Sequence, residues 1–309
     1  MGLATREAYG KALLQLGAEN NNVVVLDADL SKSTKTGDFA AQYSDRFINV
    51  GIAEQNLMGI AAGLASYGKV PFASTFAVFA TGRAFEIIRN SVCYPNLNVK
   101  VAATHAGISV GEDGGSHQSI EDIALMNSLP NMSVIVPADA RETEEVIKYA
   151  ADHDGPVYIR LGRLAAVDIF DESYTYEYGK GVQLTDGDDV AIVATGLMTA
   201  QAKKAAEVLK ADGINVRVIH IPTIKPIDRE IIEKAAKETN FIVTCEEHSV
   251  IGGLGSVVAS VTSETHPTKV VKIGINDVFG ESGTPAELLE KYGMTAENVV
   301  KVVKENMYR

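Results

Sequence analysis

The sequence has few cysteines and no long apolar run. Only Cys93 and Cys245 occur among 309 residues. They lie far apart in apolar surroundings, which favours a reduced intracellular environment and predicts no zinc site. No apolar stretch approaches the ~18 residues that a membrane span needs, and the N-terminal segment lacks the pattern of a signal peptide. We therefore expect a cytoplasmic protein with no membrane association.

Positive charge is also scarce. Lys and Arg number 28 against 40 Asp and Glu, which gives a formal net charge of −12 at pH 7. A chain this acidic is not expected to bind nucleic acid or anionic membranes, although a local basic pocket for a phosphate group is compatible with it. Apolar residues make up 46% of the chain, so core material is ample and the length suits two domains.

Short β-branched runs alternate with helical patterns from end to end. Most of the runs are continuously apolar, as expected for parallel strands that are buried on both faces. We expect strands at 23–29, 47–52, 99–105, 133–139, 157–161, 190–196, 214–221, 241–247 and 269–274, and helices within 6–16, 53–67, 140–151 and 199–211. This alternation predicts an α/β fold of two doubly wound domains with mostly parallel sheets.

A polar, tyrosine-rich stretch at 166–188 interrupts this rhythm. It runs into the turn-forming sequence Asp-Gly-Asp-Asp, and such composition is typical of a connection between domains. We therefore place the linker at 166–188, between a first domain over 1–165 and a second over 189–309.

The residues that follow the predicted strands are the first candidates for a site, because ligands bind beyond the carboxyl ends of parallel strands. They lie at Asp27–Thr36, at Glu54, at Thr104–Gln118 and at Arg160–Arg163. The segment 104–122, THAGISVGEDGGSHQSIED, combines histidines, carboxylates and glycines, and glycines let a ligand approach the backbone closely. It indicates an active site. The alternative is an ordinary connection in which Asp113 or Ser119 caps a helix.

Glu54 and two aromatic residues each have two interpretations. Glu54 lies at the start of a predicted helix, where the macrodipole favours a carboxylate for purely structural reasons. Phe76 and Phe79, in STFAVF, can be ordinary core aromatics. Four other histidines belong to no convergent motif and are expected to be structural: His153, His220, His248 and His266.

Several motifs together resemble the transketolase family. FINVGIAEQN, STFAVF, THAGISVGEDGGSHQS with LPNMSVIVPAD, and GPVYIRLGR have the order and spacing of its pyrimidine-binding domain. IKPID, TCEEHSVIGGLGSVVA and FGESGTPAEL resemble its C-terminal domain. The family's diphosphate-binding domain, with its GDG motif and downstream Asn, has no counterpart. The chain therefore resembles the C-terminal subunit of a split transketolase.

The resemblance implies thiamine diphosphate as the cofactor, with Mg²⁺ or Ca²⁺ held by the partner subunit and no metal ligand in this chain. Glu54 matches the catalytic glutamate that hydrogen-bonds the aminopyrimidine N1′ atom. Phe76 and Phe79 match aromatics that pack on the pyrimidine, and Asp29 matches a carboxylate near the cofactor. The next family aromatic is replaced by Gly82, which implies a different pocket edge.

The resemblance also implies residues for the substrate. His117 matches a catalytic histidine that hydrogen-bonds substrate oxygen and aids proton transfer, and Asp113 matches the residue that reads a donor hydroxyl. The implied cluster for the terminal phosphate of the sugar is His105, Arg163, Ser33 and Arg6. Arg160 should face the opposite side of its strand and serve as a control for Arg163. The implied reaction moves a two-carbon ketol unit from a ketose phosphate to an aldose phosphate in the pentose phosphate pathway.

The implied partner is an N-terminal subunit that carries the diphosphate-binding domain, in a heterotetramer with two copies of each chain. Alone, this chain is expected to be able to form a homodimer. Three alternatives are a deoxyxylulose-phosphate synthase-like enzyme, a 2-oxoacid dehydrogenase β subunit and a non-catalytic regulatory subunit. Glu112 and the SHQS ending argue against the first, and the GEDG block argues against the second. The intact Glu54, Asp113 and His117 argue against the third.

Overall fold

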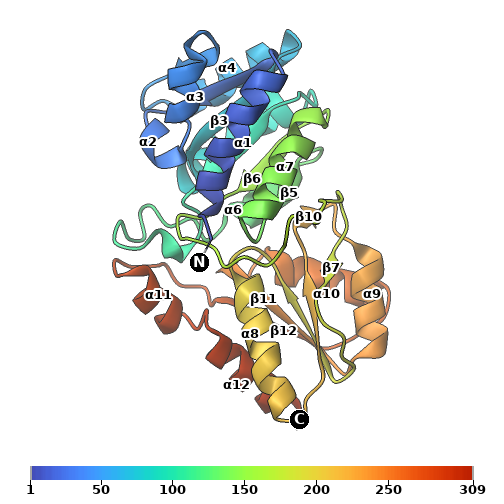
Figure 1. Ribbon diagram of the computed structural model, residues 1–309. Helices are drawn as coiled ribbons and strands as arrows, with labels where there is room; N and C mark the ends of the chain where they lie inside the picture. Colours follow the sequence, from blue (N-terminus) through green and yellow to red (C-terminus); the bar gives the residue numbers. More distant parts are fainter. Residues whose placement is uncertain (1, 308–309) are drawn as a thin grey trace.

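The alternating strands and helices form two α/β lobes, which lie one above the other in Figure 1. The structure is a computed structural model that describes residues 2–307. The fold class predicted from the sequence, α/β with mostly parallel sheets, is confirmed. Among these residues, no helix is both long and apolar enough to span a membrane.

Each lobe has its own set of elements. The upper lobe contains α1 (Thr5–Glu19), β1 (Val23–Asp27), α2 (Ser31–Thr34), α3 (Gly37–Gln42), η1 (Ser44–Arg46), β2 (Phe47–Asn49), α4 (Glu54–Ser66), β3 (Val70–Phe76), η2 (Phe79–Arg83), α5 (Phe85–Ile87), η3 (Ile88–Cys93), β4 (Lys100–Thr104), η4 (Ile108–Val110), α6 (Asp122–Asn127), β5 (Ser133–Ile135), α7 (Ala140–Asp152) and β6 (Val157–Arg160). The lower lobe contains β7 (Val182–Gln183), β8 (Val190–Ala194), α8 (Met198–Ala211), β9 (Val216–His220), β10 (Thr223–Lys225), α9 (Arg229–Glu238), β11 (Ile242–Ser249), α10 (Leu254–Glu264), β12 (Val270–Ile275), α11 (Pro285–Lys291) and α12 (Ala296–Met307).

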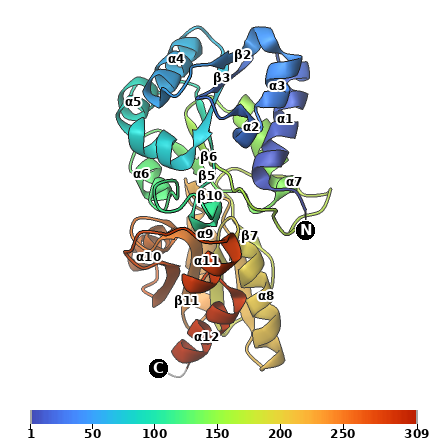
Figure 2. The ribbon, with the colours of Figure 1, turned by 90° about the vertical axis from the view of Figure 1, so that its left-hand side faces the viewer.

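The upper sheet has the strand order β10-β5-β6-β4-β3-β1-β2, and only β10 pairs antiparallel. Helices cover both of its faces, with α1 and α7 on one side and α4 and α5 on the other (Figure 2). In β1, Val23 and Val25 pack toward α1 and α7, whereas Val24 and Leu26 pack toward α4, because successive side chains alternate along a strand. Burial on both faces explains the continuous apolar runs.

Strand β3 was not predicted from the sequence. It contains Pro71, and proline is rare in central strands because it donates no backbone hydrogen bond. The Val70 N–H donates to Asn22 O on the β1 side, so the nitrogen of Pro71 faces β4. Pairing with β4 starts only at Phe72, and the proline therefore removes no bond from the sheet. The short strands β7 and β10 were also not predicted.

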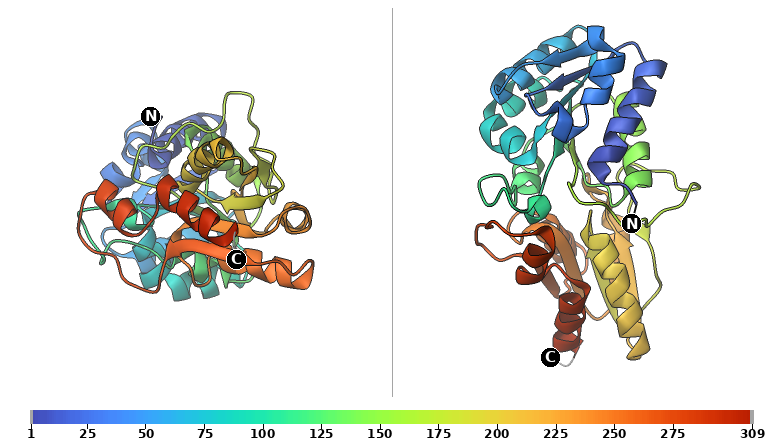
Figure 3. Two further views of the ribbon diagram at one scale, coloured as in Figure 1. Left: turned by 90° about the horizontal axis from the view of Figure 1, so that it is seen from below. Right: turned by 60° about the vertical axis from the view of Figure 1, so that its left-hand side comes forward.

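The lower sheet has the order β12-β11-β8-β9-β7 and is parallel except for β7. Helices α8 and α12 cover one face, and α9 and α10 cover the other, as the view from below shows (Figure 3). Residues 161–181, between β6 and β7, form no helix or named strand. For the two domains we propose the boundaries read from the sequence, 1–165 and 189–309, with the linker at 166–188.

Buried polar contacts join the lobes. Arg160, at the end of β6, donates to both carboxylate oxygens of Asp122 and, at 2.9 Å, to the carbonyl oxygen of Glu247 in β11. Burial disfavours the charged form of Asp122, but the Arg160 guanidinium keeps the pKa of this carboxyl group below its ordinary value. The expectation that Arg160 can serve as a control for Arg163 is therefore wrong, because its removal would leave Asp122 buried and unpaired.

Candidate active site

The candidate site lies at the carboxyl ends of four neighbouring strands, β6, β4, β3 and β1. Arg163 follows β6, His105 follows β4, Phe76 ends β3, and Asp29 follows β1. Two helix starts add to this edge, since α1 begins next to Arg6 and α4 begins at Glu54. The topology therefore gathers at one edge of the sheet residues that are spread over the first 163 positions.

Glu54 is buried, with a side chain that is 2% exposed. Its Oε1 accepts a hydrogen bond from Arg83 Nη1 at 2.8 Å, whereas its Oε2 is buried and has no partner among the described residues. A buried carboxylate oxygen without a donor is destabilising by about 1–3 kcal/mol. The Arg83 guanidinium also lies 4.8 Å from the centre of the Phe79 ring. The unpartnered Oε2 can accept a hydrogen bond from an N–H or O–H group of a ligand.

Phe76 and Phe79 form one wall of the site. Their rings are nearly parallel, with centroids 5.9 Å apart and an interplanar angle of 10°. The imidazole of His105 stacks on Phe76 at 3.9 Å, and His117 meets the Phe79 ring edge-on at 5.4 Å. Phe76 is buried, but Phe79 is only partly so. The two rings therefore form a partly exposed surface that His105 and His117 contact. Aromatic residues of an ordinary hydrophobic core would instead be packed among apolar side chains.

The residues expected to bind phosphate lie together. Arg6 Nη1 donates to the carbonyl oxygen of Ser33 at 2.8 Å and lies 3.4 Å from His105 Nε2. The Nε atom of Arg6 is buried without a partner among the described residues. Arg163 Nη1 donates to the carbonyl oxygen of Val110 and, at 3.1 Å, to Glu112 Oε2. Two guanidinium groups therefore flank one imidazole.

Burial, together with the charges of Arg6 and Arg163, lowers the pKa of His105 to about 3. The imidazole is then neutral at physiological pH. Because Arg6 donates toward Nε2, the proton of the ring belongs on Nδ1, which lies 2.8 Å from Thr104 Oγ1. Positive charge in the cluster therefore comes from the two arginines rather than from His105.

The remaining predicted residues lie around this cluster. His117 is half-buried, with Nδ1 3.0 Å from Ser116 Oγ. Asp113 is exposed, and Asp29 is exposed and accepts from Asn49 Nδ2 at 3.1 Å. Helix α6 has no side-chain cap, so the structure does not support the alternative in which the loop merely caps a helix.

Gly82 lies on the surface, and a Cβ added there would meet no atom within 4 Å. The pocket edge therefore stays open at this position. Sequence reasoning missed Arg83, the ion-pair partner of Glu54, because no motif marks it. It also left Glu247 without a role, although TCEEHS was noticed. Only the backbone path through η2, a turn of π-helix, brings Arg83 back to the start of α4.

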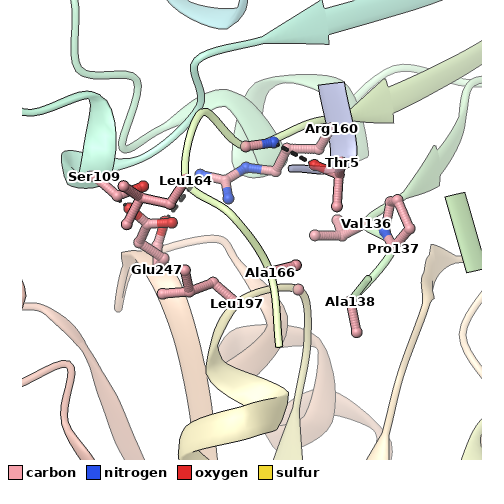
Figure 4. A pocket seen from close by; sticks show the side chains of 12 residues that line it. Thr5, Ser109, Val136, Pro137, Ala138, Arg160, Leu164, Ala166, Leu197 and Glu247 are labelled. Atoms are coloured by element: carbon pink, nitrogen blue, oxygen red, sulfur yellow. Dashed lines mark hydrogen bonds between the residues drawn. The ribbon is translucent and has the colours of Figure 1, made fainter. Parts of the chain in front are cut away.

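Two further observations concern metal binding and a cavity near the candidate site. Within residues 2–307, no group of three or more His, Cys, Asp or Glu side chains is placed to hold a metal ion. A small cavity of about 40 Å³ lies between the lobes and is lined in part by Thr5, Arg160 and Glu247 (Figure 4). Its lining contains none of the residues predicted for cofactor or substrate, so it is separate from the candidate site.

Comparison with known proteins identifies both halves of the chain. Residues 1–167 match the family model of the transketolase pyrimidine binding domain, and residues 179–299 match that of the transketolase C-terminal domain. A protein of Methanocaldococcus jannaschii named "Putative transketolase C-terminal section" is 52% identical over 98% of this chain and 96% of its own length. A 6-deoxy-6-sulfo-D-fructose transketolase subunit of Clostridium sp. (strain MSTE9) is 41% identical over 97% of this chain and 93% of its own.

A solved structure and a longer relative are also similar to this chain. A solved structure described as "Split gene transketolase, inactive beta4 tetramer" is similar with a TM-score of 0.93 and 62% identity, over 99% of both chains. Human transketolase is 38% identical over 98% of this chain, which corresponds to only 49% of the human protein.

Proposed function

Because the chain belongs to the transketolase family, we propose that it is the C-terminal subunit of a thiamine-diphosphate-dependent transketolase that is split between two polypeptides. The enzyme would transfer a two-carbon ketol unit from a ketose phosphate to an aldose phosphate, in the pentose phosphate pathway of the cytoplasm. The observation that carries the proposal is the convergence of Glu54, the Phe76–Phe79 wall and the arginine cluster at one edge of the sheet.

The residues of this edge fit the aminopyrimidine of the cofactor. Glu54 Oε2 is a buried oxygen in need of a partner, and it could hold or share a proton with a ring nitrogen. Phe76 and Phe79 offer aromatic faces on which a pyrimidine can pack. When bound, thiamine diphosphate supplies a nucleophilic thiazolium carbon. No metal cluster exists within residues 2–307, and we assign Mg²⁺ or Ca²⁺, with the diphosphate, to the partner subunit.

The substrate would lie on the other side of the same wall. We propose that His117 hydrogen-bonds substrate oxygen beside Phe79, and that Asp113, on the exposed loop, reads a donor hydroxyl. Arg6 and Arg163, with Ser33 and the neutral His105, would hold the terminal phosphate. The name of the Clostridium relative includes a sulfonated sugar, and sulfonate also presents tetrahedral oxygens. For this chain we propose phosphate.

The partner is proposed from the proteins that this chain resembles and from what it exposes. The chain matches 49% of human transketolase and is similar to a protein named as a C-terminal section, and we propose that a second chain holds one side of the cofactor. Three large apolar side chains are strongly exposed on the upper lobe: Ile52 at 78%, Tyr67 at 90% and Tyr94 at 87%. Ile52 lies two residues before Glu54. Exposed apolar groups beside a site suit a subunit interface, and we propose a heterotetramer of two copies of each chain.

Reconstitution tests the proposal. The chain is purified alone and mixed with an N-terminal subunit that carries the diphosphate-binding domain, in the presence of thiamine diphosphate and Mg²⁺. We expect no turnover of xylulose 5-phosphate with ribose 5-phosphate by either chain alone, and turnover by the mixture, with a mass that corresponds to two copies of each. Full turnover by this chain alone would refute the split-subunit proposal, and an inactive, correctly assembled mixture would refute the reaction.

A further inference from the structure

The loop at 105–118 carries His105, Asp113 and His117, and much of its support comes from the lower lobe. In Figure 3 (right) the red segment around α11 runs directly below the green loop. Three loop glycines with positive φ lie against the lower lobe. A Cβ at Gly107 would overlap the carboxyl group of Glu247 in β11, one at Gly111 would press on Pro285, and one at Gly114 would press on Ser282 Oγ. These glycines allow the loop to lie on the lower lobe without a gap.

Glu247 is the innermost of these contacts. Its side chain is buried, and Oε1 accepts a hydrogen bond of 2.7 Å from the backbone N–H of Ser109, 138 residues earlier in the chain. Figure 4 shows the carboxylate at the end of β11 beside Ser109. The backbone of Glu247 is fixed in turn, because Arg160 Nη2 donates to its carbonyl oxygen. Arg160 thus fixes the backbone of the residue whose carboxylate accepts from Ser109.

A second contact closes the other end of the loop. Gln118 is buried, and its Nε2 donates at 2.9 Å to the carbonyl oxygen of Glu281, as well as to two carbonyl oxygens of the loop. Between Ile108 and His117 the loop's own backbone hydrogen bonds are short-range turns, from Gly111 to Ile108, from Gly114 to Gly111 and from His117 to Gly114. The upper lobe holds the start of the loop through Ala106, which donates to Leu161, and its middle through Arg163, which donates to Val110, and the contacts with the lower lobe add to this support.

We propose that Glu247 is a positioning residue, through which the C-terminal domain holds the loop so that His105 and His117 face Phe76 and Phe79. Within residues 2–307 Glu247 forms no hydrogen bond or ion pair with either histidine, and it is not itself catalytic. The structural part of the inference stands on the contacts alone, and its catalytic consequence rests on the proposed function. It gives the C-terminal domain a role in the site, although none of the predicted site residues lies in that domain.

The test uses hydrogen exchange with mass spectrometry on the full chain. In Glu247→Ala, the Ser109 N–H loses its acceptor, and exchange of peptides that cover 105–118 should accelerate by about 5- to 150-fold, the equivalent of one buried donor left unsatisfied. Glu247→Gln keeps an acceptor of the same length without the charge, and it should accelerate exchange much less than Glu247→Ala does. Glu247→Asp withdraws the carboxylate by one methylene and should accelerate exchange even if the alanine variant fails to fold.

Glu246→Ala is the matched control. Glu246 is the adjacent residue and is equally buried, but its carboxylate accepts from the backbone N–H groups of Leu254 and Gly255 at the start of α10. Its loss should accelerate exchange around α10 and leave the loop unchanged. In the reconstituted complex, Glu247→Ala should lower kcat/KM about 5- to 150-fold, with the Kd for thiamine diphosphate changed by less than about threefold, since Glu54, Phe76 and Phe79 lie on other elements.

Unchanged loop exchange in both Glu247→Ala and Glu247→Asp would overturn the inference. So would an equal acceleration of loop exchange by Glu246→Ala, which would show that any loss of stability in the lower lobe has the same effect. A parent complex without transketolase turnover would refute the proposed function instead, and the exchange result would still decide the role of Glu247.

Discussion

At the scale of single residues, Glu54 combines burial, one charged partner and one free oxygen. Glu54→Gln keeps the size of the side chain and an acceptor for Arg83 but removes the carboxyl group that can exchange a proton. We predict that hydrogen–deuterium exchange at cofactor C2 in the reconstituted complex slows by about 10²- to 10⁴-fold, the usual contribution of a general acid–base group. Binding of the cofactor should weaken much less. Equally fast exchange in both proteins would show that Glu54 only stabilises the start of α4.

Arg163 tests the phosphate assignment. It also donates to Val110 and Glu112, so two donors are compared to separate loss of a phosphate contact from a change in the loop. We predict that Arg163→Ala loses a charge-assisted contact worth about 1.5–3 kcal/mol, or about 10- to 150-fold in kcat/KM, for phosphorylated donors. Hydroxypyruvate carries no phosphate, and its turnover should change little.

The comparison between donors is the control for the Arg163 experiment. If the phosphate contact contributes equally to the ground and transition states, the defect lies in KM. Arg163→Lys, which keeps a charge but not the planar fork, should lie between the parent and the alanine variant. Equal losses for both donors would assign Arg163 to the structure of the loop.

His105 predicts a dependence of stability on pH. Its pKa falls from 6.5 to about 3 on folding, so between these values the unfolded chain binds the proton and the folded chain does not. Stability from this group is therefore complete above pH 6.5 and is lost as the pH falls toward 3. Between pH 7 and pH 5 the loss should be about 2 kcal/mol.

Urea unfolding at the two pH values measures this effect. Carboxyl groups with raised pKa, such as those of Glu246 and Glu247, change stability in the opposite direction, so the difference between parent and His105→Gln is the quantity to compare. The variant should lose less stability on acidification than the parent does. The same pH dependence in both proteins would contradict a neutral, buried His105.

At the scale of elements, α4 has a glycine in the middle of its exposed face. Gly59 lies in its interior and on the surface, and a Cβ there would meet nothing within 4 Å. Glycine in a helix is less favourable than alanine by about 0.8–1.0 kcal/mol, and nothing in the isolated chain requires it. We predict that Gly59→Ala stabilises this chain by up to about 1 kcal/mol in thermal or urea unfolding. We also predict that it weakens assembly with the N-terminal subunit. Helix α4 starts at Glu54, so its exposed face lies next to the proposed interface, and an added methyl group there would hinder close packing of the partner.

Gly17 in α1 provides the contrast. A Cβ there would overlap the ring of Tyr43, so Gly17→Ala should destabilise the chain while leaving the affinity for the partner unchanged. Tighter or unaltered assembly of the Gly59→Ala variant, measured by analytical ultracentrifugation, would show that no partner packs closely on this face.

At the scale of the whole molecule, the chain is an acidic protein that has two arginines, Arg6 and Arg163, beside His105. Its net charge of −12 opposes general attraction of anions, yet Arg6 and Arg163 meet at the edge of the upper sheet. Close to a bound anion these two charges dominate, because distant surface charges are screened within about 10 Å at moderate salt. The lower lobe supplies support rather than chemistry, through Glu247, which accepts from Ser109 and from Arg160 of the upper lobe, and through the added strand β10.

Much of the fold could be predicted because its signals are local. Continuous apolar runs and helical periodicity depend on neighbours a few residues apart, and they predicted most strands and the helices α1, α4, α7 and α8. Strand β3 was missed because Pro71 argues against a central strand, and only the register with β4 shows that its missing donor is harmless. β7 and β10 are too short to carry a pattern of their own.

The sequence by itself determined the alternation of strand and helix, the acidic charge and the motifs that link this chain to transketolase. Only the tertiary structure decided that Arg83 pairs with Glu54, that Arg160 is an interdomain residue, and that Glu247 accepts from Ser109 across 138 positions. The physical reason is range. Backbone propensity and apolar periodicity act within a few residues, whereas the partner of a buried charge or amide depends on which distant segments the packed sheets bring together.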